Sequence, residues 1–197
     1  MAKRLFDLFG ATLALLLLSP VLLAAALAVK LDTPGPVFFR QVRIGRGGVP
    51  FRIHKFRTMH HDAGGPPLTV GNDPRITRAG AFLRRTRIDE LPQFIDVLLG
   101  RMSLVGPRPE VPRYVAQYPA ALRERVLAVR PGITDPASLA FIDEAALLEG
   151  ATDPERAYVE LILPAKLQQA ADYAERASLR TDIGVLWRTA ALLLQRG

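Results

Sequence analysis

The stretch ATLALLLLSPVLLAAALAV, residues 11–29, decides how this chain folds, because it has nineteen residues without a charge and a Ser-Pro pair at its centre. A straight helix of that length would extend about 28 Å, close to the thickness of a bilayer's hydrocarbon core. Pro20 has no amide hydrogen and clashes with the carbonyl one turn back, so we expect a break there, with Ser19 bonding a freed carbonyl. The stretch predicts two helical segments joined by a bend.

Basic residues lie on both sides of this apolar stretch: Lys3 and Arg4 before it, and Lys30, Arg40, Arg43 and Arg46 after it. Positive charge marks the cytoplasmic ends of membrane segments. A re-entrant helix over residues 1–31, which enters the membrane and returns to the same side, satisfies both the charges and the break. Two alternatives are a single-pass anchor and a cleaved signal peptide that ends in the small residues 24–28.

Length and composition restrict the class of protein. The chain has 197 residues, which suits a single domain, 1–197, in which residues 32–197 follow the membrane segment. It contains no cysteine, which excludes a disulfide scaffold, a cysteine nucleophile and thiolate metal sites. The three histidines stand in none of the zinc-binding spacings, so a zinc hydrolase is not expected.

The positive charge is concentrated in residues 40–87, where eleven Lys and Arg residues face two Asp residues. Such a run is either a solvated face or a site for an anion. The run has neither a recognition-helix pattern nor an aromatic series for base stacking, so no nucleic acid partner is expected. Anionic lipid or a phosphorylated substrate at a membrane fits better.

The remaining patterns predict an α+β fold that is mainly helical. Strand-like runs at 37–44 and 51–58 surround a Gly-rich turn at 45–48 and predict a small β-hairpin. Helices are expected after it at about 91–99, 119–129, 137–149 and 154–177, with a kink at Pro164. A last helix carries one apolar face: Leu179, Ile183, Leu186, Trp187, Ala190 and Leu194. That face either packs in the core or makes the helix an amphipathic interfacial one, with Trp187 as an anchor.

The decapeptide RRTRIDELPQ, residues 84–93, places two carboxylates directly after three arginines. Because Pro92 is tolerated only in a first turn, the helix should begin at about Asp89. Unpaired amides and nearby arginines would then lower the pKa of Asp89, which suits attack on phosphorus. Glu90, about 100° around the helix, could hold a divalent cation. The alternative is a simple helix cap with a favourable first-turn charge.

Two further segments offer cations. Arg108 stands between Pro107 and Pro109, which restricts its backbone and suits bidentate recognition of a phosphate. Lys55 and Arg57 alternate on one side of a predicted strand, so both could face one anion. An idle arginine in a Pro-rich turn and a polar strand face are the alternatives.

Together these segments resemble the bacterial sugar transferase family, the small monotopic phosphoglycosyl transferases. The matching pieces occur in the family's order through most of the chain: residues 3–7, 19–20, 34–39, 55–59, 72–77, 89–93, 102–109 and 130–134. The ordered set is far more specific than any one piece. The sequence departs from the family pattern at 135–139 and at Asp96, where Asn is common. These departures leave the sugar specificity open, because the sugar contacts are expected in the C-terminal half.

The resemblance implies a reaction in which a UDP-sugar donates sugar-1-phosphate to a polyprenol phosphate, with Mg²⁺ as cofactor, leaving UMP. In the family, the residue matching Asp89 is the nucleophile and forms a covalent phosphosugar adduct, and the one matching Glu90 assists through the metal. The pair matching Ser19 and Pro20 breaks a re-entrant helix in one leaflet. The implied location is the cytoplasmic face of the bacterial inner membrane.

The resemblance also implies substrate-binding residues. Arg108 is the expected ligand of the donor's phosphate or nucleotide. The other candidates for phosphate contacts are Lys55, Arg57, Arg84, Arg85, Arg87 and Arg130. The expected partners are the UDP-sugar, the polyprenol phosphate and membrane lipid, and a homo-oligomer is left open. The competing function is a non-catalytic basic membrane adaptor that binds anionic lipid through residues 40–87.

Overall fold

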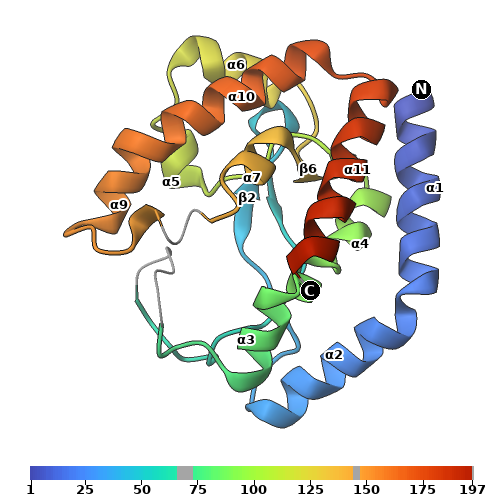
Figure 1. Ribbon diagram of the computed structural model, residues 1–197, viewed down its shortest axis with the longest axis vertical. Coiled ribbons are helices and arrows are strands. Elements are labelled where there is room, and N and C mark those ends of the chain that lie inside the picture. The colour runs from blue at the N-terminus through green and yellow to red at the C-terminus, as the bar shows by residue number, and fades with distance from the viewer. Residues whose placement is uncertain (66–72, 144–146, 197) are drawn as a thin grey trace.

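The computed structural model describes residues 1–65, 73–143 and 147–196, in which the chain is mainly helical with three two-stranded sheets (Figure 1). The α-helices are α1 (Ala2–Leu17), α2 (Ser19–Asp32), α3 (Arg78–Arg85), α4 (Gln93–Leu98), α5 (Pro112–Val115), α6 (Ala120–Leu127), α7 (Pro136–Ala140), α9 (Pro154–Ala157), α10 (Leu163–Arg176) and α11 (Leu179–Arg196). The strands are β1 (Phe38–Phe39), β2 (Val42–Ile44), β3 (Pro50–Arg52), β4 (Lys55–Phe56), β5 (Ser103–Val105) and β6 (Gly132–Thr134). This confirms the α+β, mainly helical class.

The predicted break in the apolar stretch is present. Helices α1 and α2 meet at Leu18 with a bend of 63°. Pro20 lies in the first turn of α2, where its missing amide costs no hydrogen bond, and Ser19 Oγ donates to the Leu16 carbonyl at 2.8 Å. Among the described residues, no single helix is long and apolar enough to cross a membrane, whereas α1 and α2 taken together have the length and composition to do so.

The predicted hairpin is also present, as two short ladders in one register. Phe38 lies opposite Phe56, and Val42 lies opposite Arg52. Between the ladders, the Ile53 amide donates to the Gln41 carbonyl at 3.1 Å, which keeps the same pairing. A 3-10 turn, η1 (Arg46–Gly48), closes the hairpin where the Gly-rich turn was expected.

A parallel pair of strands, which the sequence patterns did not indicate, brings residues 103–105 beside residues 132–134. The chain segments touch through their main chains: a Cβ on Gly132 would lie 2.0 Å from the Gly106 amide nitrogen, so neither glycine can carry a side chain there. The Gly132 amide donates to the Pro107 carbonyl at 3.0 Å. This contact fixes the backbone directly before Arg108.

The C-terminal helices follow the sequence expectations in part. Helix α6 matches the expected helix at 119–129, and α9, η3 (Tyr158–Ile162) and α10 together match the one at 154–177. A kink was expected at Pro164. The structure has a π-helix, η3, that ends directly before α10, and Pro164 lies in the first turn of α10. The expected helix at 137–149 is only the short α7 before residues 144–146, which lie outside the described part.

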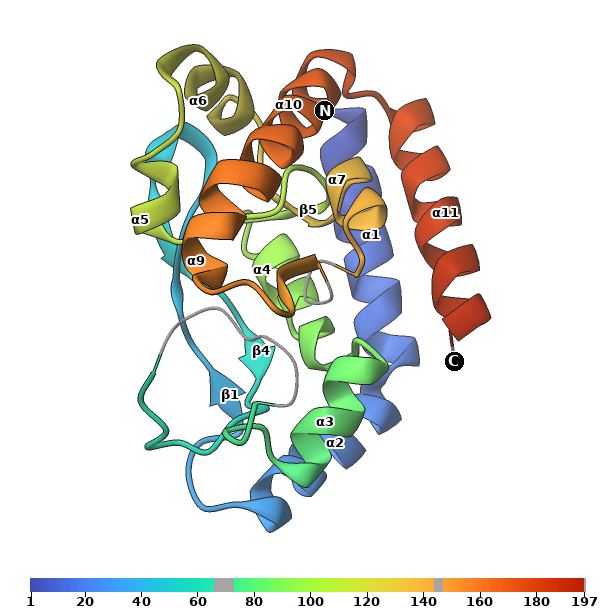
Figure 2. The same ribbon diagram turned by 60° about the vertical axis from the view of Figure 1, so that its left-hand side comes forward.

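Helix α11 does not bury the whole apolar face that its sequence predicted. Val185 is buried in a core cluster with residues of α1, α4 and β5, and Leu186 packs against that cluster. Ile183, Trp187 and Leu194 instead leave 56%, 78% and 85% of their surface exposed. In Figure 2, α11 stands at the edge of the molecule, so the core-packing alternative holds only for its inner side.

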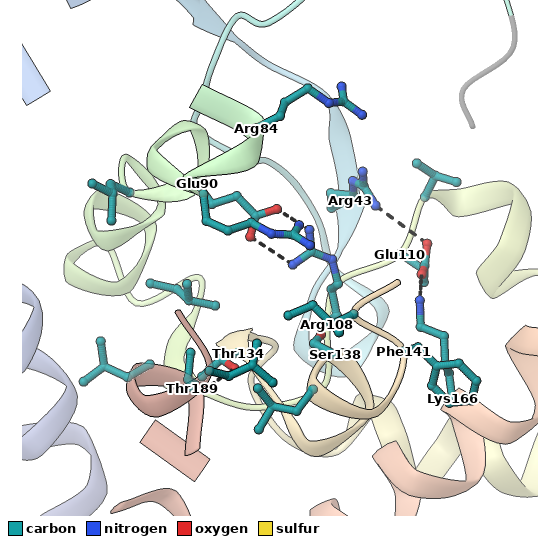
Figure 3. A pocket seen from close by; sticks show the side chains of 18 of the residues that line it. Arg43, Arg84, Glu90, Arg108, Glu110, Thr134, Ser138, Phe141, Lys166 and Thr189 are labelled. Carbon is teal, nitrogen blue, oxygen red and sulfur yellow. Dashed lines mark hydrogen bonds and ion pairs between the residues drawn. The ribbon is translucent and has the colours of Figure 1, made fainter. Parts of the chain in front are cut away.

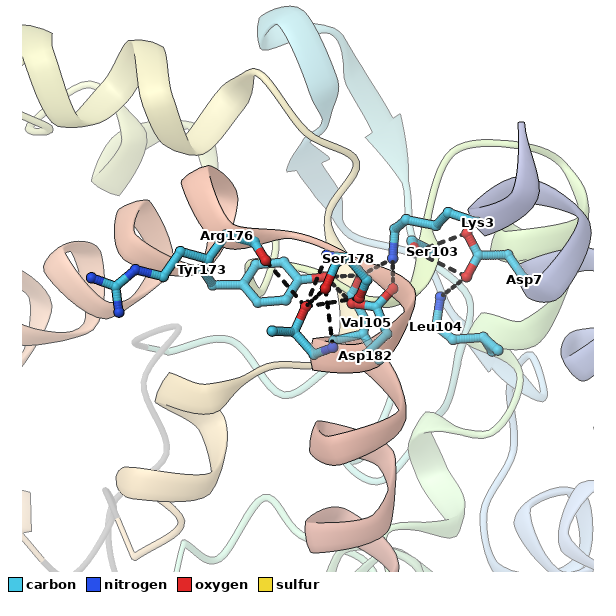
Figure 4. A network of polar contacts seen from close by, with 10 residues as sticks. Lys3, Asp7, Ser103, Leu104, Val105, Tyr173, Arg176, Ser178 and Asp182 are labelled. Atoms are coloured by element: carbon cyan, nitrogen blue, oxygen red, sulfur yellow. Dashed lines mark hydrogen bonds and ion pairs between the residues drawn. The ribbon is translucent and has the colours of Figure 1, made fainter.

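A buried polar network joins α1 to the C-terminal helices across β5 (Figure 4). Lys3 forms an ion pair with the fully buried Asp182 of α11 and donates to the Val105 carbonyl at 3.0 Å. Tyr173 of α10 donates to Asp182 at 2.5 Å. One turn further along α1, the buried Asp7 accepts hydrogen bonds from Ser103 Oγ and the Leu104 amide. The basic start of the chain is therefore part of the folded core.

Candidate active site

Two adjacent carboxylates stand on a tight 3-10 turn, η2 (Ile88–Glu90), between α3 and α4. Arg87 begins this turn with φ of 58°, the left-handed region, and is the one non-glycine residue with positive φ in the described chain. Pro92 is the N-cap of α4, which begins at Gln93. The expectation that a helix starts at Asp89 is therefore wrong: the carboxylates precede the helix, because the strained residue before them turns the chain.

Glu90 is held between two cations from distant segments. Its Oε1 accepts from Lys55 Nζ of β4 at 2.7 Å, and both carboxylate oxygens accept from the guanidinium fork of Arg108 (Figure 3). Burial alone would raise the pKa of Glu90, but Arg108 and Lys55 together hold it well below its usual range. Glu90 is therefore ionised, and it fixes Arg108 beside the turn.

Asp89 is buried, with 8% of its surface exposed, and its Oδ1 has no hydrogen-bond partner among the described residues. Burial raises the pKa of Asp89 above its ordinary value, since the charges of Lys55, Arg84 and Arg87 only partly offset the loss of water and Glu90 adds repulsion. The expected lowering of this pKa is wrong, because desolvation outweighs the arginines. The result is a carboxylate with an uncommitted oxygen next to three cations.

The side chains of the three arginines before the turn do not all point to the cavity. Arg84 and Arg87 line a cavity beside the turn and act electrostatically on Asp89. Arg85 is exposed and lies over the Phe82 ring at 5.8 Å, on the outside of α3. The structure therefore brings two of these three candidates to the site.

Arg57 and Arg130, both candidates for phosphate contacts, are placed elsewhere. Arg57 is buried and donates to carbonyl groups at the end of α2 and after it, including those of Thr33 at 2.9 Å and Pro36 at 2.7 Å. Its side chain thereby caps α2 instead of joining Lys55, which corrects the expectation that both face one anion. Arg130 Nε donates to the Gly100 carbonyl at 2.9 Å, where it holds the end of α4. Unsatisfied carbonyls after helices explain both positions.

The cavity beside the turn measures about 490 Å³ and is lined by both polar and apolar side chains. Its polar lining includes, besides Arg84, Arg87, Glu90 and Arg108, the side chains Gln41, Arg43, Glu110 and Lys166. Its apolar lining includes Leu91, which precedes α4, and Phe94, Ile133, Leu139, Leu186 and Leu192 of α4, β6, α7 and α11. A pocket of this size can accept a molecule with a charged part and an apolar part.

Sequence reasoning missed a second polar cluster in the same cavity. Glu110 accepts from the Tyr158 hydroxyl at 2.7 Å and lies 3.7 Å from Arg43 and 3.9 Å from Lys166 (Figure 3). Its members come from β2, the loop after β5, η3 and α10. Glu110 stands two residues after Arg108 in the Pro-Arg-Pro-Glu segment, and that proximity was the one local signal for it.

The two carboxylates of the turn could hold a magnesium ion if phosphate oxygens of a bound molecule completed its shell. Asp89 Oδ1 has no partner in the described residues, and Glu90 Oε2 accepts one hydrogen bond, so each carboxylate keeps an oxygen with capacity. No group of three or more His, Cys, Asp or Glu side chains that could hold a metal occurs in the described segments. Mg²⁺ is commonly bound by one or two carboxylates with phosphate oxygens completing its shell, which is the case that these residues fit.

A buried carboxylate with an unpaired oxygen, in the same turn as residues of a cavity lined by both cations and apolar side chains, suits an enzyme that transfers a phosphorylated group to or from an amphiphile. The comparison with known proteins agrees with this class. The profile of the bacterial sugar transferase family matches residues 1–196, so the chain belongs to that family. The resemblance seen in the sequence is confirmed, and the chain is a transferase.

Three relatives illustrate the match. A UDP-glucose:undecaprenyl-phosphate glucose-1-phosphate transferase of Caulobacter vibrioides is 41% identical over 98% of this chain and 69% of its own length. A protein of the same name from Escherichia coli is 52% identical over 67% of this chain. A UDP-N-acetylgalactosamine-undecaprenyl-phosphate N-acetylgalactosaminephosphotransferase of Aeromonas hydrophila is 46% identical over 67% of it. The matches span only 29% of the Escherichia coli relative and 32% of the Aeromonas one.

Proposed function

We propose that this protein moves sugar-1-phosphate from a UDP-sugar to a polyprenol phosphate, giving a polyprenol-diphosphate sugar and UMP. The observation that carries the proposal is Asp89 Oδ1, a buried carboxylate oxygen without a hydrogen-bond partner in the described chain. Its sequence neighbours Arg87 and Glu90 line the cavity. The names of the relatives support the same donor and acceptor classes.

The reaction proceeds in two displacements at one phosphorus atom. Asp89 attacks the phosphorus that carries the sugar, the bond from this phosphorus to the bridging oxygen breaks, and UMP leaves with the electron pair. An oxygen of the polyprenol phosphate then attacks the same phosphorus, the bond to Asp89 breaks, and the carboxylate is restored. Each displacement forms one P–O bond and breaks one, so no redox partner is needed.

The surrounding cations stabilise the charge that moves in these steps. Arg84 and Arg87 line the cavity and neutralise the diphosphate, and Arg108, whose fork is held by Glu90, offers its remaining N–H groups to the same group. Mg²⁺, held by Asp89 and Glu90, would supply further neutralisation of the leaving phosphate. Lys55 keeps Glu90 ionised and in place, because its ammonium is within 2.7 Å of Oε1.

We further propose that α1 and α2 form a re-entrant segment on the cytoplasmic face of the bacterial inner membrane. The bend of 63° and the exposed apolar side chains of α1, among them Leu5, Phe9 and Leu16, support this placement. The apolar side chains that line the cavity, among them Leu186 and Leu192 of α11, would then receive the isoprenoid part of the acceptor. A donor from the cytoplasm and an acceptor from the membrane can meet only at such an interface.

The test is the covalent adduct. The protein is incubated with a UDP-sugar alone, quenched rapidly and weighed intact, with the variants Asp89→Asn and Asp62→Asn in parallel. We expect one phosphosugar on the wild type and on the Asp62→Asn variant, whose changed residue is exposed, and none on the Asp89→Asn variant. The Asp89→Asn variant should lose turnover and still bind anionic vesicles.

Two results would contradict this scheme. Turnover without any adduct in rapid-quench samples would mean direct transfer from donor to acceptor. If the wild type releases no UMP and the Asp89→Asn variant keeps its full binding to anionic vesicles, the result would favour the basic membrane adaptor. Lipid binding by such an adaptor through residues 40–87 does not need this carboxylate.

A further inference from the structure

Ser138 lines the cavity, and its hydroxyl group has no hydrogen-bond partner in the described part of the chain. The residue lies in α7 and lines the cavity, and its Oγ is buried with no hydrogen bond to any described residue. Folded proteins pair nearly all buried hydroxyl groups, because an unpaired one loses its bonds to water and gains nothing in return. At the wall of a substrate cavity, the missing partner can be a group of the substrate.

The position of Ser138 relative to the phosphate-binding loop is fixed by one buried carboxylate. Asp135 accepts from the Ser138 amide at 2.6 Å and from the Arg108 amide at 3.1 Å. Asp135 is almost fully buried, so this double contact is protected from water. The start of α7 and the Pro-Arg-Pro loop therefore form one unit, and Ser138 lies beside Arg108 (Figure 3).

Two other side chains of the wall complete a surface for a polyhydroxylated ring. Figure 3 shows Glu90 on one side of the Arg108 guanidinium, and Glu110 and Phe141 on the other. The Glu110 carboxylate accepts from the Tyr158 hydroxyl and has further lone pairs for hydroxyl donors. The Phe141 ring can cover the apolar face of a sugar. A few polar groups among apolar ones are the usual basis of ligand orientation in a pocket.

We propose that Ser138, Glu110 and Phe141 form the subsite for the sugar ring of the donor, in which Ser138 Oγ reads one ring substituent. This inference rests on the proposed function. The sugar is attached to the phosphorus under attack, so it must lie next to the group that binds this phosphate. Ser138 meets that condition, since its backbone and that of Arg108 share Asp135. Of the three residues, Ser138 lies in α7, Phe141 follows α7 directly, and Glu110 lies in the loop after β5.

The test compares two serine variants on a panel of UDP-glucose, UDP-galactose and UDP-N-acetylglucosamine, with UMP release as the readout. The Ser138→Ala variant should lose about 3- to 10-fold in kcat/KM for the preferred donor, which is the effect of one hydrogen bond, and less for the others. Its inhibition by UMP and its resistance to denaturant should not weaken, since only an unpaired hydroxyl is removed.

The matched control is Ser178→Ala, an exposed serine that accepts from the Thr181 amide at the start of α11. It should show the reverse pattern: lower resistance to denaturant and an unchanged ratio of kcat/KM between donors. The two variants together separate a role in donor choice from a role in folding.

Three outcomes overturn the subsite. An unchanged donor ratio in the Ser138→Ala variant removes its role, and an equal loss for all donors with weaker UMP inhibition assigns the hydroxyl to the nucleotide. Loss of stability in that variant would make Ser138 structural. The proposed function fails separately, if the wild type releases no UMP from any UDP-sugar in the presence of polyprenol phosphate.

Discussion

Arg87 is held in a backbone conformation that costs an L-residue free energy. With φ of 58°, it lies in the left-handed region that glycine enters without penalty. The conformation turns the chain from α3 into η2, the turn that carries the buried Asp89 and the cavity-lining Glu90. Strain of this kind is commonly found at active sites, where the surrounding structure maintains it.

The first prediction separates this strain from the charge of the same residue. In the Arg87→Gly variant, the free energy of unfolding should be unchanged or rise by up to about 1 kcal/mol, whereas turnover should fall because a cation beside Asp89 is lost. The matched control is Arg85→Gly, at the exposed last residue of α3, where the helical conformation gives glycine no advantage and the change should cost up to about 1 kcal/mol. Equal destabilisation in both variants, measured by denaturant titration, would show that side-chain contacts of Arg87 stabilise the turn.

The second prediction concerns the ionisation of Asp89. Because burial raises its pKa, the rate of adduct formation should fall on the acid side at a pH above the ordinary value for aspartate, about 3.9. Arg84 lowers the pKa of Asp89, so the Arg84→Gln variant should move this acid limb to higher pH. The measurement is the pH profile of UMP release with donor alone, which avoids the titration of the acceptor's phosphate.

Arg85→Gln serves as the control for that profile, since Arg85 lies over Phe82 on the outer side of α3. Its acid limb should stay with that of the wild type. A limb that moves equally in both variants would show that net charge, and not the position of Arg84, sets the pKa.

For single residues, the sequence predicted which side chains belong to the site better than it predicted what surrounds them. The pair Asp89 and Glu90 and the cation Arg108 could be picked out from local spacing. The direction of the pKa of Asp89 could not, because burial depends on chain segments far from residue 89. Arg57 was misplaced for the same reason: its partners are carbonyls after α2, more than twenty residues earlier in the chain.

Helix α11 is joined to the rest of the molecule by a buried polar contact. Its buried Asp182 accepts from Lys3 of α1 and Tyr173 of α10, and its Leu186 and Leu192 form part of the cavity. The side chain of Asp182 is fully enclosed, so its oxygens find their hydrogen-bond partners in these side chains and not in water.

The third prediction tests this contact. The Asp182→Ala variant should lose about 1.5–3 kcal/mol of unfolding free energy, the usual worth of hydrogen bonds to a charged group. The control is Glu160→Gln, which breaks an exposed ion pair with Arg156 and should cost only about 0.3–0.5 kcal/mol. Both are measured by denaturant unfolding. A similar small loss in both variants would mean that α11 is held by its apolar contacts alone.

The sequence predicted those elements whose signals are local. The Ser-Pro break, the hairpin around its Gly-rich turn and most helices have such signals. The parallel pair β5–β6 has none, because its strands are three residues long and nearly thirty residues apart in the sequence. The apolar face of α11 was ambiguous, since core packing and exposure to lipid require the same residues.

At the scale of the whole molecule, the bent pair α1–α2 makes a prediction about topology. The chain has no cysteine, so single cysteines can be placed without a background. The fourth prediction is that Ala2→Cys and Pro34→Cys, at exposed positions before and after the pair, react with a membrane-impermeant reagent from the same side of sealed vesicles. The Leu17→Cys variant, at the bend, should react only after the membrane is dissolved.

Labelling of the two ends from opposite sides would mean that the pair crosses the membrane. The Pro20→Ala variant provides a comparison, since removal of the proline allows one continuous helix over both segments. If the two ends are labelled from opposite sides in the Pro20→Ala variant and from the same side in the protein that keeps Pro20, the bend determines the topology.

The contact between Gly106 and Gly132 has a consequence for engineering this protein. Arg108 is aligned by two strands of peptide backbone pressed together, where even a methyl group finds no room. Variant libraries that aim to change which sugar is transferred should therefore leave residues 103–108 and 130–134 unchanged and vary residues 138–142 instead. Substitutions in the first set would misalign the Arg108 guanidinium. Substitutions in the second set would vary the side chains around the proposed sugar subsite.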